Sequence, residues 1–301
     1  MPRAIIIDTD PGIDDAVAIL LALAAAELAV RGLVAVAGNL KLPATERNAR
    51  AVVELAGRSD IPVFAGCPRP IAGTRPDAAH IHGDEGLGAL ALPPPTEALQ
   101  AQHGVGWLIQ TLRAAAPQSV TLCALGPLTN IAVALVMAPD IAAAIAELVI
   151  MGGGSHGNIT PAAEFNIHCD PQAAAIVLAS GRPITLVPLD ATETVIGTPE
   201  RIAPIAALGG RCSAAAATLL APSGAGRSPV AMHDACVIAY LLAPGLFRLS
   251  EAHVTVETAS ALTLGMTIIE RRRRAPNARI VDHIDVDGLF HLLAARLANL
   301  P

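Results

Sequence analysis

The chain has 301 residues, of which 53% are apolar and 15% are charged, so it can bury a large core and lacks the composition of a disordered protein. Its net charge of −6 and the absence of a broad basic stripe argue against binding to a nucleic-acid backbone. The five cysteines are dispersed and form no C-x-x-C pair, so we expect buried, reduced thiols rather than disulfides or a zinc site.

The N-terminus leads directly into an apolar run at residues 5–7 and has no secretory signal. The longest early apolar stretch, residues 16–26, is too short to span a bilayer. We therefore expect a soluble, cytoplasmic protein with no membrane partner.

Short apolar runs alternate with longer helical segments up to residue 188. Strands are expected at residues 5–7, 33–37, 61–65, 120–124, 148–151 and 184–188. Helices are expected at residues 14–26, 45–56, 104–115, 130–137 and 171–180, with a long loop at 66–95. The strands are continuous Val/Ile/Leu runs, which is typical of a parallel sheet covered on both faces. This rhythm predicts an α/β fold with an open, doubly wound, mostly parallel sheet flanked by helices.

The C-terminal part is less regular. Helices are expected at residues 199–208, 213–220, 234–242 and 286–297, and strands at 254–257, 267–269 and 279–281. The basic run at residues 271–274 is interpreted as a solvated strand end or turn, with a phosphate or nucleic-acid patch as the alternative. Without an internal repeat or a long linker, residues 1–301 are expected to form one domain.

The strongest indication of a functional site lies between the first expected strand and the helix that follows it. Residues 8–15 read DTDPGIDD, and these four carboxylates would repel one another unless a cation or shared protons compensated. Oxygen ligands select Ca²⁺ or Mg²⁺ over zinc, and a bound cation would acidify a water for hydrolysis. The alternative interpretation makes Asp14 a helix cap and the other aspartates a solvated turn.

Further loops rich in glycine or polar residues follow other expected strands, at residues 38–39, 125–126 and 152–154. Ligands of doubly wound sheets collect at these carboxyl ends. The motif at residues 8–15 resembles the N-terminal motif of the inosine–uridine-preferring nucleoside hydrolase family, and the resemblance covers essentially the whole chain. The further matches, in chain order, are GN at 38–39, RNA at 47–49, HIHG at 80–83, GPLTN at 126–130, MGGG at 151–154, EFN at 164–166, DP at 170–171, HD at 233–234 and LGMT at 264–267.

The resemblance implies one Ca²⁺ held by the carboxylates of Asp10, Asp15 and Asp234 and by the backbone carbonyl of Leu125. It implies that the ribose 2′- and 3′-hydroxyls and the attacking, metal-bound water complete the shell, with Asp10 as general base. The implied reaction is hydrolysis of the N-glycosidic bond of purine or pyrimidine ribonucleosides to ribose and free base. The implied partner is a small-molecule ribonucleoside, and the assembly of relatives implies a homodimer or homotetramer.

The same resemblance assigns the remaining site residues. The residues expected to hydrogen-bond the ribose are Asp14, Asn39, Asn158, Glu164 and Asn166. His233 matches the histidine on the leaving-base side, and histidine suits proton donation at neutral pH. His82 matches a histidine of the base pocket, with His80 as the alternative. Phe165 lies either in the core or against the substrate.

One segment departs from the family pattern. Family members often carry a Tyr or another aromatic shortly before the late His-Asp pair, whereas residues 221–229 read APSGAGRSP. This leaves base preference and leaving-group activation open, with Arg227 as a substitute donor. The metal and ribose sets are complete, so 2′-deoxynucleosides, which cannot make one of the metal contacts, are expected to be poor substrates.

Two other functions fit parts of the pattern. Asp8 and Asp10 resemble the Asp-x-Asp loop of Mg²⁺-dependent phosphatases, but Gly12 stands where those enzymes have Thr or Val, and they usually lack an adjacent Asp-Asp pair. A non-catalytic nucleoside- or Ca²⁺-binding relative is the second alternative. Taken alone, Asp234 would be a helix N-cap and His233 an ordinary loop histidine.

Overall fold

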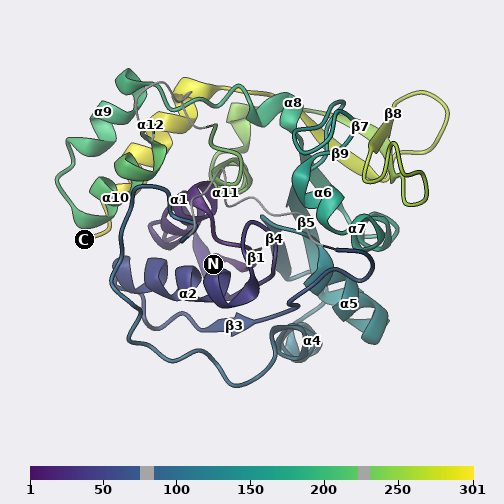
Figure 1. The fold of residues 1–301 in the computed structure, drawn as a ribbon, viewed down its shortest axis with the longest axis horizontal. Coiled ribbons are helices and arrows are strands. Elements are labelled where there is room, and N and C mark those ends of the chain that lie inside the picture. Colours follow the sequence, from purple (N-terminus) through teal and green to yellow (C-terminus); the bar gives the residue numbers. More distant parts are fainter. Residues whose placement is uncertain (75–84, 223–230) are drawn as a thin grey trace.

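The computed structural model describes residues 1–74, 85–222 and 231–301, and a nine-stranded sheet runs through them (Figure 1). The strands, in order across the sheet, are β3 (Val63–Ala65), β2 (Leu28–Ala35), β1 (Arg3–Thr9), β4 (Val120–Ala124), β5 (Ile145–Met151), β6 (Ile184–Val187), β9 (Ala278–Ile284), β7 (Phe247–Val256) and β8 (Thr267–Glu270). Neighbours from β3 to β9 are parallel, whereas β7 pairs antiparallel with β9 and β8. The expected α/β class with a mostly parallel sheet is confirmed.

Both faces of the central sheet are buried, because successive residues of a strand enter different cores. In β1, Ile5 and Ile7 belong to one core, and Ile6 belongs to the other. The same alternation separates Leu122 from Cys123 in β4. A strand buried on both faces needs no polar positions, which explains the continuous apolar runs in the sequence.

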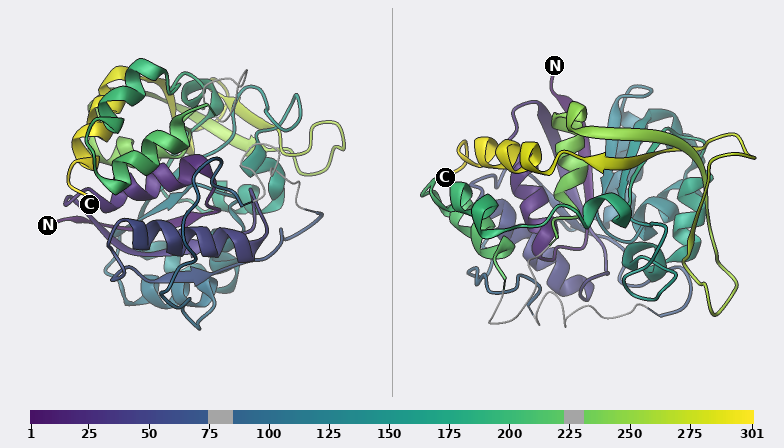
Figure 2. Two further views of the ribbon diagram at one scale, coloured as in Figure 1. Left: turned by 60° about the vertical axis from the view of Figure 1, so that its left-hand side comes forward. Right: turned by 90° about the horizontal axis from the view of Figure 1, so that it is seen from above.

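Helices cover each core. The first core contains residues of α1 (Ile13–Leu23), α2 (Leu42–Leu55), α9 (Pro199–Ala206), α10 (Arg211–Leu220), α11 (Ala235–Leu242) and α12 (Val286–Leu297). The second contains residues of α4 (Gly104–Ala114), α5 (Thr129–Met137), the 3-10 helix η1 (Pro139–Ala144) and α7 (Pro171–Leu178). The views place α9, α10 and α12 at one end of the molecule and the β7–β8 hairpin at the other (Figures 1 and 2). Every residue of α1 is buried, because α2, α10 and α11 all pack on it.

The strand order reverses beside β1. From β1 the chain builds outward through β2 and β3, and then returns to the other side of β1 as β4. Such a reversal leaves room at the carboxyl ends of the two strands, where ligands of doubly wound folds bind. Asp10 follows β1 here and Leu125 follows β4, and the Leu125 amide donates to the Asp8 carbonyl at 2.8 Å. The topology therefore positions the site.

The C-terminal half differs from the sequence-based expectation in detail. The apolar pattern predicts β7 only at residues 254–257, but the strand begins at Phe247, because its partly exposed face breaks the apolar run. The short helices α6 (Phe165–Cys169), α8 (Leu189–Thr192) and η2 (Pro244–Leu246) are not predicted, since none is long enough to establish a helical period. Residues 271–274 form an exposed turn in which Arg271 pairs with Asp282 at 2.8 Å, in agreement with the solvated-turn interpretation.

All five cysteines are free, and four of them are buried. Within the described ranges, the helices are all too short or too polar to cross a membrane.

Candidate active site

Five aspartates meet at the carboxyl end of β1. Asp8 lies in β1 and Asp10 directly after it, Asp14 and Asp15 form the first turn of α1, and Asp234 precedes α11. The packing of α1 on α11 brings Asp234 to the N-terminal aspartates. Their exposed fractions lie between 0% and 8%, so the solvated-turn interpretation is wrong.

Asp15 is held by four donors. Its carboxylate accepts from the Thr9 hydroxyl, from the backbone amides of Asp10 (3.3 Å) and Gly12 (3.0 Å), and from the Asn39 side-chain amide (3.2 Å). Gly12 is the N-cap of α1, so this bond joins the Asp15 side chain to the N-cap backbone at the start of the helix. Asp15 is therefore fixed in position before any ligand arrives.

Asp10 is enclosed by backbone. Its Oδ2 accepts from the Asn39 amide at 2.6 Å, whereas its buried Oδ1 has no hydrogen-bond partner among the described residues. A Cβ atom on Gly38 would lie 1.9 Å from Oδ2, and one on Gly126 would lie 2.2 Å from Oδ1. Glycine is required at both positions because the chain passes so close to this carboxylate.

Burial and mutual repulsion oppose ionisation of these carboxyls. Burial raises the pKa of Asp8 to about 8. Burial and then the neighbouring charges, chiefly Asp15 for Asp10 and Asp14 for Asp234, raise the pKa of both carboxyls well above the usual range. Burial and the charge of Asp14 likewise raise the pKa of Asp15. Without a cation the group must therefore hold extra protons at neutral pH.

The geometry fits a divalent cation. Asp14, Asp15 and Asp234 each offer one oxygen, and these oxygens lie within 4.8 Å of one another. Since Ca²⁺–oxygen distances are about 2.3–2.6 Å, two ligands of one ion can be about 5 Å apart at most. Asp10 lies beside this trio rather than within it, and it is electrostatically coupled to Asp15 and Asp234.

The capping interpretation is wrong for Asp14 and holds for Asp234 only as its position. The N-cap of α1 is Gly12, not Asp14. Asp234 occupies the N-cap position of α11, but its side chain makes no capping hydrogen bond. The Asp234 carboxyl instead lies within hydrogen-bonding distance of the Asp15 carboxyl. Two carboxyl groups lie this close only when they share a proton or bind a cation.

Two further polar side chains, Asn166 and Glu164, contact the backbone that follows β4 and β5. Asn166 donates through Nδ2 to the Leu125 carbonyl at 2.8 Å, so the expected ribose contact and the expected backbone ligand are adjacent. Glu164 accepts from the amides of Gly153, Asn166 and Ile167 at 2.8–3.1 Å and caps α6. Burial, opposed by these bonds, raises its pKa to about 6.

Phe165 and Asn158 support the same loop. Phe165 is 9% exposed and packs with Cys169 and Ile159, which places most of its ring in a small core. Its amide donates to Asn158 Oδ1 at 2.9 Å. His82, His80 and Arg227 lie outside the described residues.

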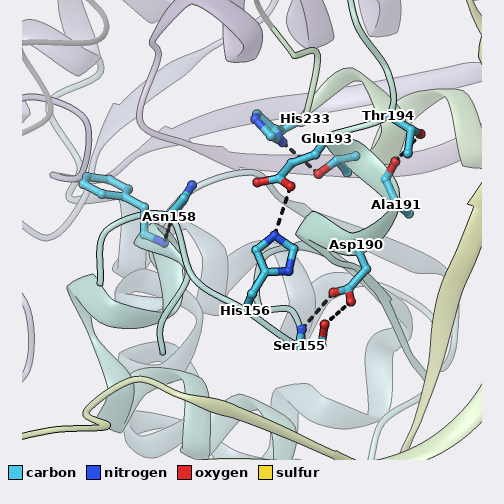
Figure 3. A network of polar contacts seen from close by, with 10 residues as sticks. Ser155, His156, Asn158, Asp190, Ala191, Glu193, Thr194 and His233 are labelled. Carbon is cyan, nitrogen blue, oxygen red and sulfur yellow. Dashed lines mark hydrogen bonds and ion pairs between the residues drawn. The ribbon is translucent and has the colours of Figure 1, made fainter. Parts of the chain in front are cut away.

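His233 lies beside α8 (Figure 3). Its Nδ1 is 2.7 Å from the Thr192 hydroxyl. On the same helix, Asp190 accepts from the Ser155 amide at 2.8 Å and also from its hydroxyl. This helix escapes prediction from the sequence, although polar residues after the strand at 184–188 carry the same signal as the loops after the other strands.

The fold and the acidic site at its switch point are those of an α/β protein whose carboxylate cluster could hold a metal ion. The chain belongs to the inosine-uridine preferring nucleoside hydrolase family, whose model matches residues 5–291. The expected resemblance is confirmed.

Relatives and solved structures agree. The chain is 42% identical to the pyrimidine-specific ribonucleoside hydrolase RihA of Salmonella arizonae and 40% identical to an uncharacterized protein of Schizosaccharomyces pombe, over 99% of each chain. It resembles a plant nucleoside hydrolase (31% identity, TM-score 0.89, 99% of both chains) and a purine-preferring ribonucleoside hydrolase of Gardnerella vaginalis (27% identity, TM-score 0.89, 98% of both chains).

Gly126→Ala should damage the cation site, because its methyl group would collide with Asp10 Oδ1. We expect a loss of Ca²⁺ affinity of about 10- to 100-fold, as measured by isothermal titration calorimetry. Gly106→Ala is the matched control, since its Cβ would meet its nearest neighbour at 3.6 Å in α4. Equal Ca²⁺ affinity in Gly126→Ala and wild type would contradict the role of this glycine.

Stabilisation by Ca²⁺ should grow with pH. The pKa values of Asp8, Asp10 and Asp234 are higher in the folded chain than in the unfolded chain, where they are about 3.9. Their contribution to the stability of the cation-free fold is therefore present below about pH 4 and lost as the pH rises toward 8. Added CaCl₂ should raise the thermal midpoint more at pH 8 than at pH 5, with NaCl of equal ionic strength as control. An equal increase at both pH values would count against cation binding here.

Proposed function

We propose that this protein catalyses Ca²⁺-dependent hydrolysis of the N-glycosidic bond of ribonucleosides, releasing ribose and free base. The observation that carries the proposal is the group of five buried aspartates at the switch point of a nucleoside hydrolase fold. Burying several carboxylates without a counter-charge is costly, so the group implies a cation.

The proposed ligands of the cation are the carboxylates of Asp10, Asp15 and Asp234 and the carbonyl of Leu125. All are oxygen donors, which favours a hard cation. The buried Oδ1 of Asp10 has no hydrogen-bond partner among the described residues, which supports a cation or a water as its partner. When bound, the Ca²⁺ would orient the ribose hydroxyls and acidify the attacking water. Asp14, whose oxygen lies with those of Asp15 and Asp234, is proposed to hydrogen-bond the ribose.

Asp10 is proposed to take the proton from the attacking water. The Asn39 amide fixes one carboxylate oxygen at 2.6 Å, which leaves the other to act. As the bond to the base breaks, positive charge develops on the ribose. The neighbouring carboxylates stabilise that charge, and Asn166, whose NH₂ group is bonded to Leu125, presents its oxygen.

His233 is proposed to donate a proton or hydrogen bond to the leaving base, since histidine titrates near neutral pH. Asn39, Asn158 and Glu164 are proposed to contact the ribose, and Phe165 and His82 to line the substrate pocket. RihA of Salmonella arizonae, at 42% identity, is named pyrimidine-specific, which supports uridine and cytidine as the preferred substrates.

Release of reducing sugar from inosine, adenosine, uridine and cytidine tests the proposal. We expect ribose with Ca²⁺ present and none after chelation, with activity restored by added Ca²⁺. Asp10→Asn should lower kcat by at least about 10²- to 10⁴-fold, because general base catalysis contributes that much. Asp140→Asn, at an exposed surface ion pair, is the control.

Other outcomes of this assay point elsewhere. A folded protein that binds Ca²⁺ and nucleosides without cleaving them would be a non-catalytic relative. Release of phosphate from phosphomonoesters with Mg²⁺ would support the Asp-x-Asp phosphatase instead.

Substrates without the 2′-hydroxyl should react poorly. Deoxyuridine has only one of the two vicinal hydroxyls proposed to bind the cation, and removing an interaction that stabilises the transition state lowers the rate. We expect kcat/KM for deoxyuridine to be at least about 100-fold below that for uridine. Comparable values for both nucleosides would refute hydroxyl chelation while leaving hydrolysis intact.

A further inference from the structure

The short helix α6 carries two of the residues proposed to contact the ribose. Glu164 is its N-cap, and Asn166 lies in its first turn. Isolated helices shorter than about 12–15 residues are marginal in water, so the position of this five-residue helix depends on its contacts. Its N-terminal end is held by Glu164, which accepts from the amides of Asn166 and Ile167, and by the bond from Asn166 to the Leu125 carbonyl. Its C-terminal end requires a separate contact.

His168 joins the C-terminal end of α6 to the turn between β7 and β8, which lies beside it (Figure 1). This turn, residues 257–266, contains most of the LGMT motif, which has no role in the proposed function. Nδ1 of His168 lies 3.0 Å from the Leu264 carbonyl oxygen. A carbonyl only accepts, so Nδ1 carries the hydrogen of this bond whether the ring is neutral or protonated. The ring is thus bonded to the turn in both states.

Glycine at position 265 lets the turn reach the backbone of α6. Gly265 has a φ of +80°, and a Cβ atom there would lie 2.8 Å from the Cα atom and 3.2 Å from the backbone nitrogen of His168. The Gly265 amide donates to the Glu257 carbonyl at 2.8 Å, and the Glu257 amide donates to the Met266 carbonyl at 3.0 Å. The turn is therefore held by its own bonds while it contacts the helix.

The same hairpin also contacts a partner of Glu164. Thr267 begins β8 directly after the turn and is buried. A Cβ atom on Gly153 would lie 2.7 Å from the Thr267 hydroxyl oxygen, so this side chain packs directly against Gly153. The Gly153 amide donates to Glu164 Oε2 at 3.0 Å. The hairpin thus contacts both segments that determine where the Glu164 carboxylate lies.

We propose that the β7–β8 turn positions the ribose-binding residues of α6, and that His168 is the positioning residue through which it acts. This rests on the proposed function, in which Glu164 and Asn166 contact the ribose. The proposed backbone ligand Leu125 is held independently of α6, because its amide donates to the Asp8 carbonyl at 2.8 Å. Loss of the His168 bond should therefore weaken nucleoside binding and leave Ca²⁺ binding intact.

Pseudouridine separates binding from chemistry, because a carbon–carbon bond joins its uracil to the ribose and the proposed hydrolysis does not cleave it. In the presence of CaCl₂, His168→Leu should weaken pseudouridine binding, measured by isothermal titration calorimetry, by about 10-fold. It should lower kcat/KM for uridine by about 10- to 100-fold, since small displacements of substrate-positioning groups have effects of this size. Its Ca²⁺ affinity without nucleoside should stay within about threefold of wild type.

Two further variants complete the test. His168→Asn places an amide nitrogen near the position of Nδ1, so it can donate to the Leu264 carbonyl and should bind pseudouridine within about threefold of wild type. His253→Leu removes a contact of the same type, in which Nδ1 lies 2.8 Å from the Ala275 carbonyl oxygen. His253 lies in β7, away from the turn, and this variant should change neither pseudouridine binding nor activity.

Hydrogen exchange reports on α6 without a substrate. In His168→Leu, peptides that cover residues 165–169 should exchange at least about 10-fold faster than in wild type, because the helix opens locally more often. Peptides that cover α4, in the other part of the molecule, should exchange at the wild-type rate. Faster exchange throughout the chain would indicate general destabilisation and would overturn the assignment.

The remaining outcomes are equally decisive. Unchanged pseudouridine binding in His168→Leu, a loss that His168→Asn does not restore, or a parallel loss of Ca²⁺ affinity would each overturn the role of His168. If wild type neither cleaves uridine nor binds pseudouridine, the proposed function fails and this proposal fails with it. If wild type does both and His168→Leu behaves identically, only the proposal for His168 fails.

Discussion

The burial of five carboxyl groups at one point is the constraint on which this structure depends. The free energy of burying so many ionised carboxylates away from water is prohibitive unless protons or a cation neutralise them. The chain surrounds the group with donors: Asn39 contacts both Asp10 and Asp15, and the backbone amide of Gly12, the N-cap of α1, donates to Asp15. Glycines at 38 and 126 let the backbone come close enough to do this.

The sheet topology delivers these groups to one place. The strand order reverses between β1 and β4, and apolar cores cover both faces of the sheet there. Asn166, in the helix α6 that follows β5, donates to the Leu125 carbonyl that follows β4. Segments after two neighbouring strands thus meet at the site. The later elements complete the rim, with α8 contacting both the loop at Ser155 and the ring of His233.

The parallel sheet and the place of the acidic site are predictable from the sequence. The buried parallel strands are visible as continuous apolar runs, and the acidic motif at residues 8–15 identifies the site. The sequence does not show which aspartates converge: Asp14, not Asp10, lies with Asp15 and Asp234 in the closest group. Such distances depend on how α1 packs against α11. The short helix α8 escapes prediction because four residues carry no period, and the partly exposed start of β7 does so because it interrupts the apolar pattern.

The packing of α11 against α1 has a consequence for how the chain folds. Asp15 and Asp234 are roughly 220 residues apart in the chain, so the acidic trio closes a very long loop. Contacts of such high sequence separation carry the entropic cost of closing the intervening loop. A nascent chain still lacking α11 would present only the N-terminal part of the group. A cation held by this trio would therefore require both α1 and α11 to be in place.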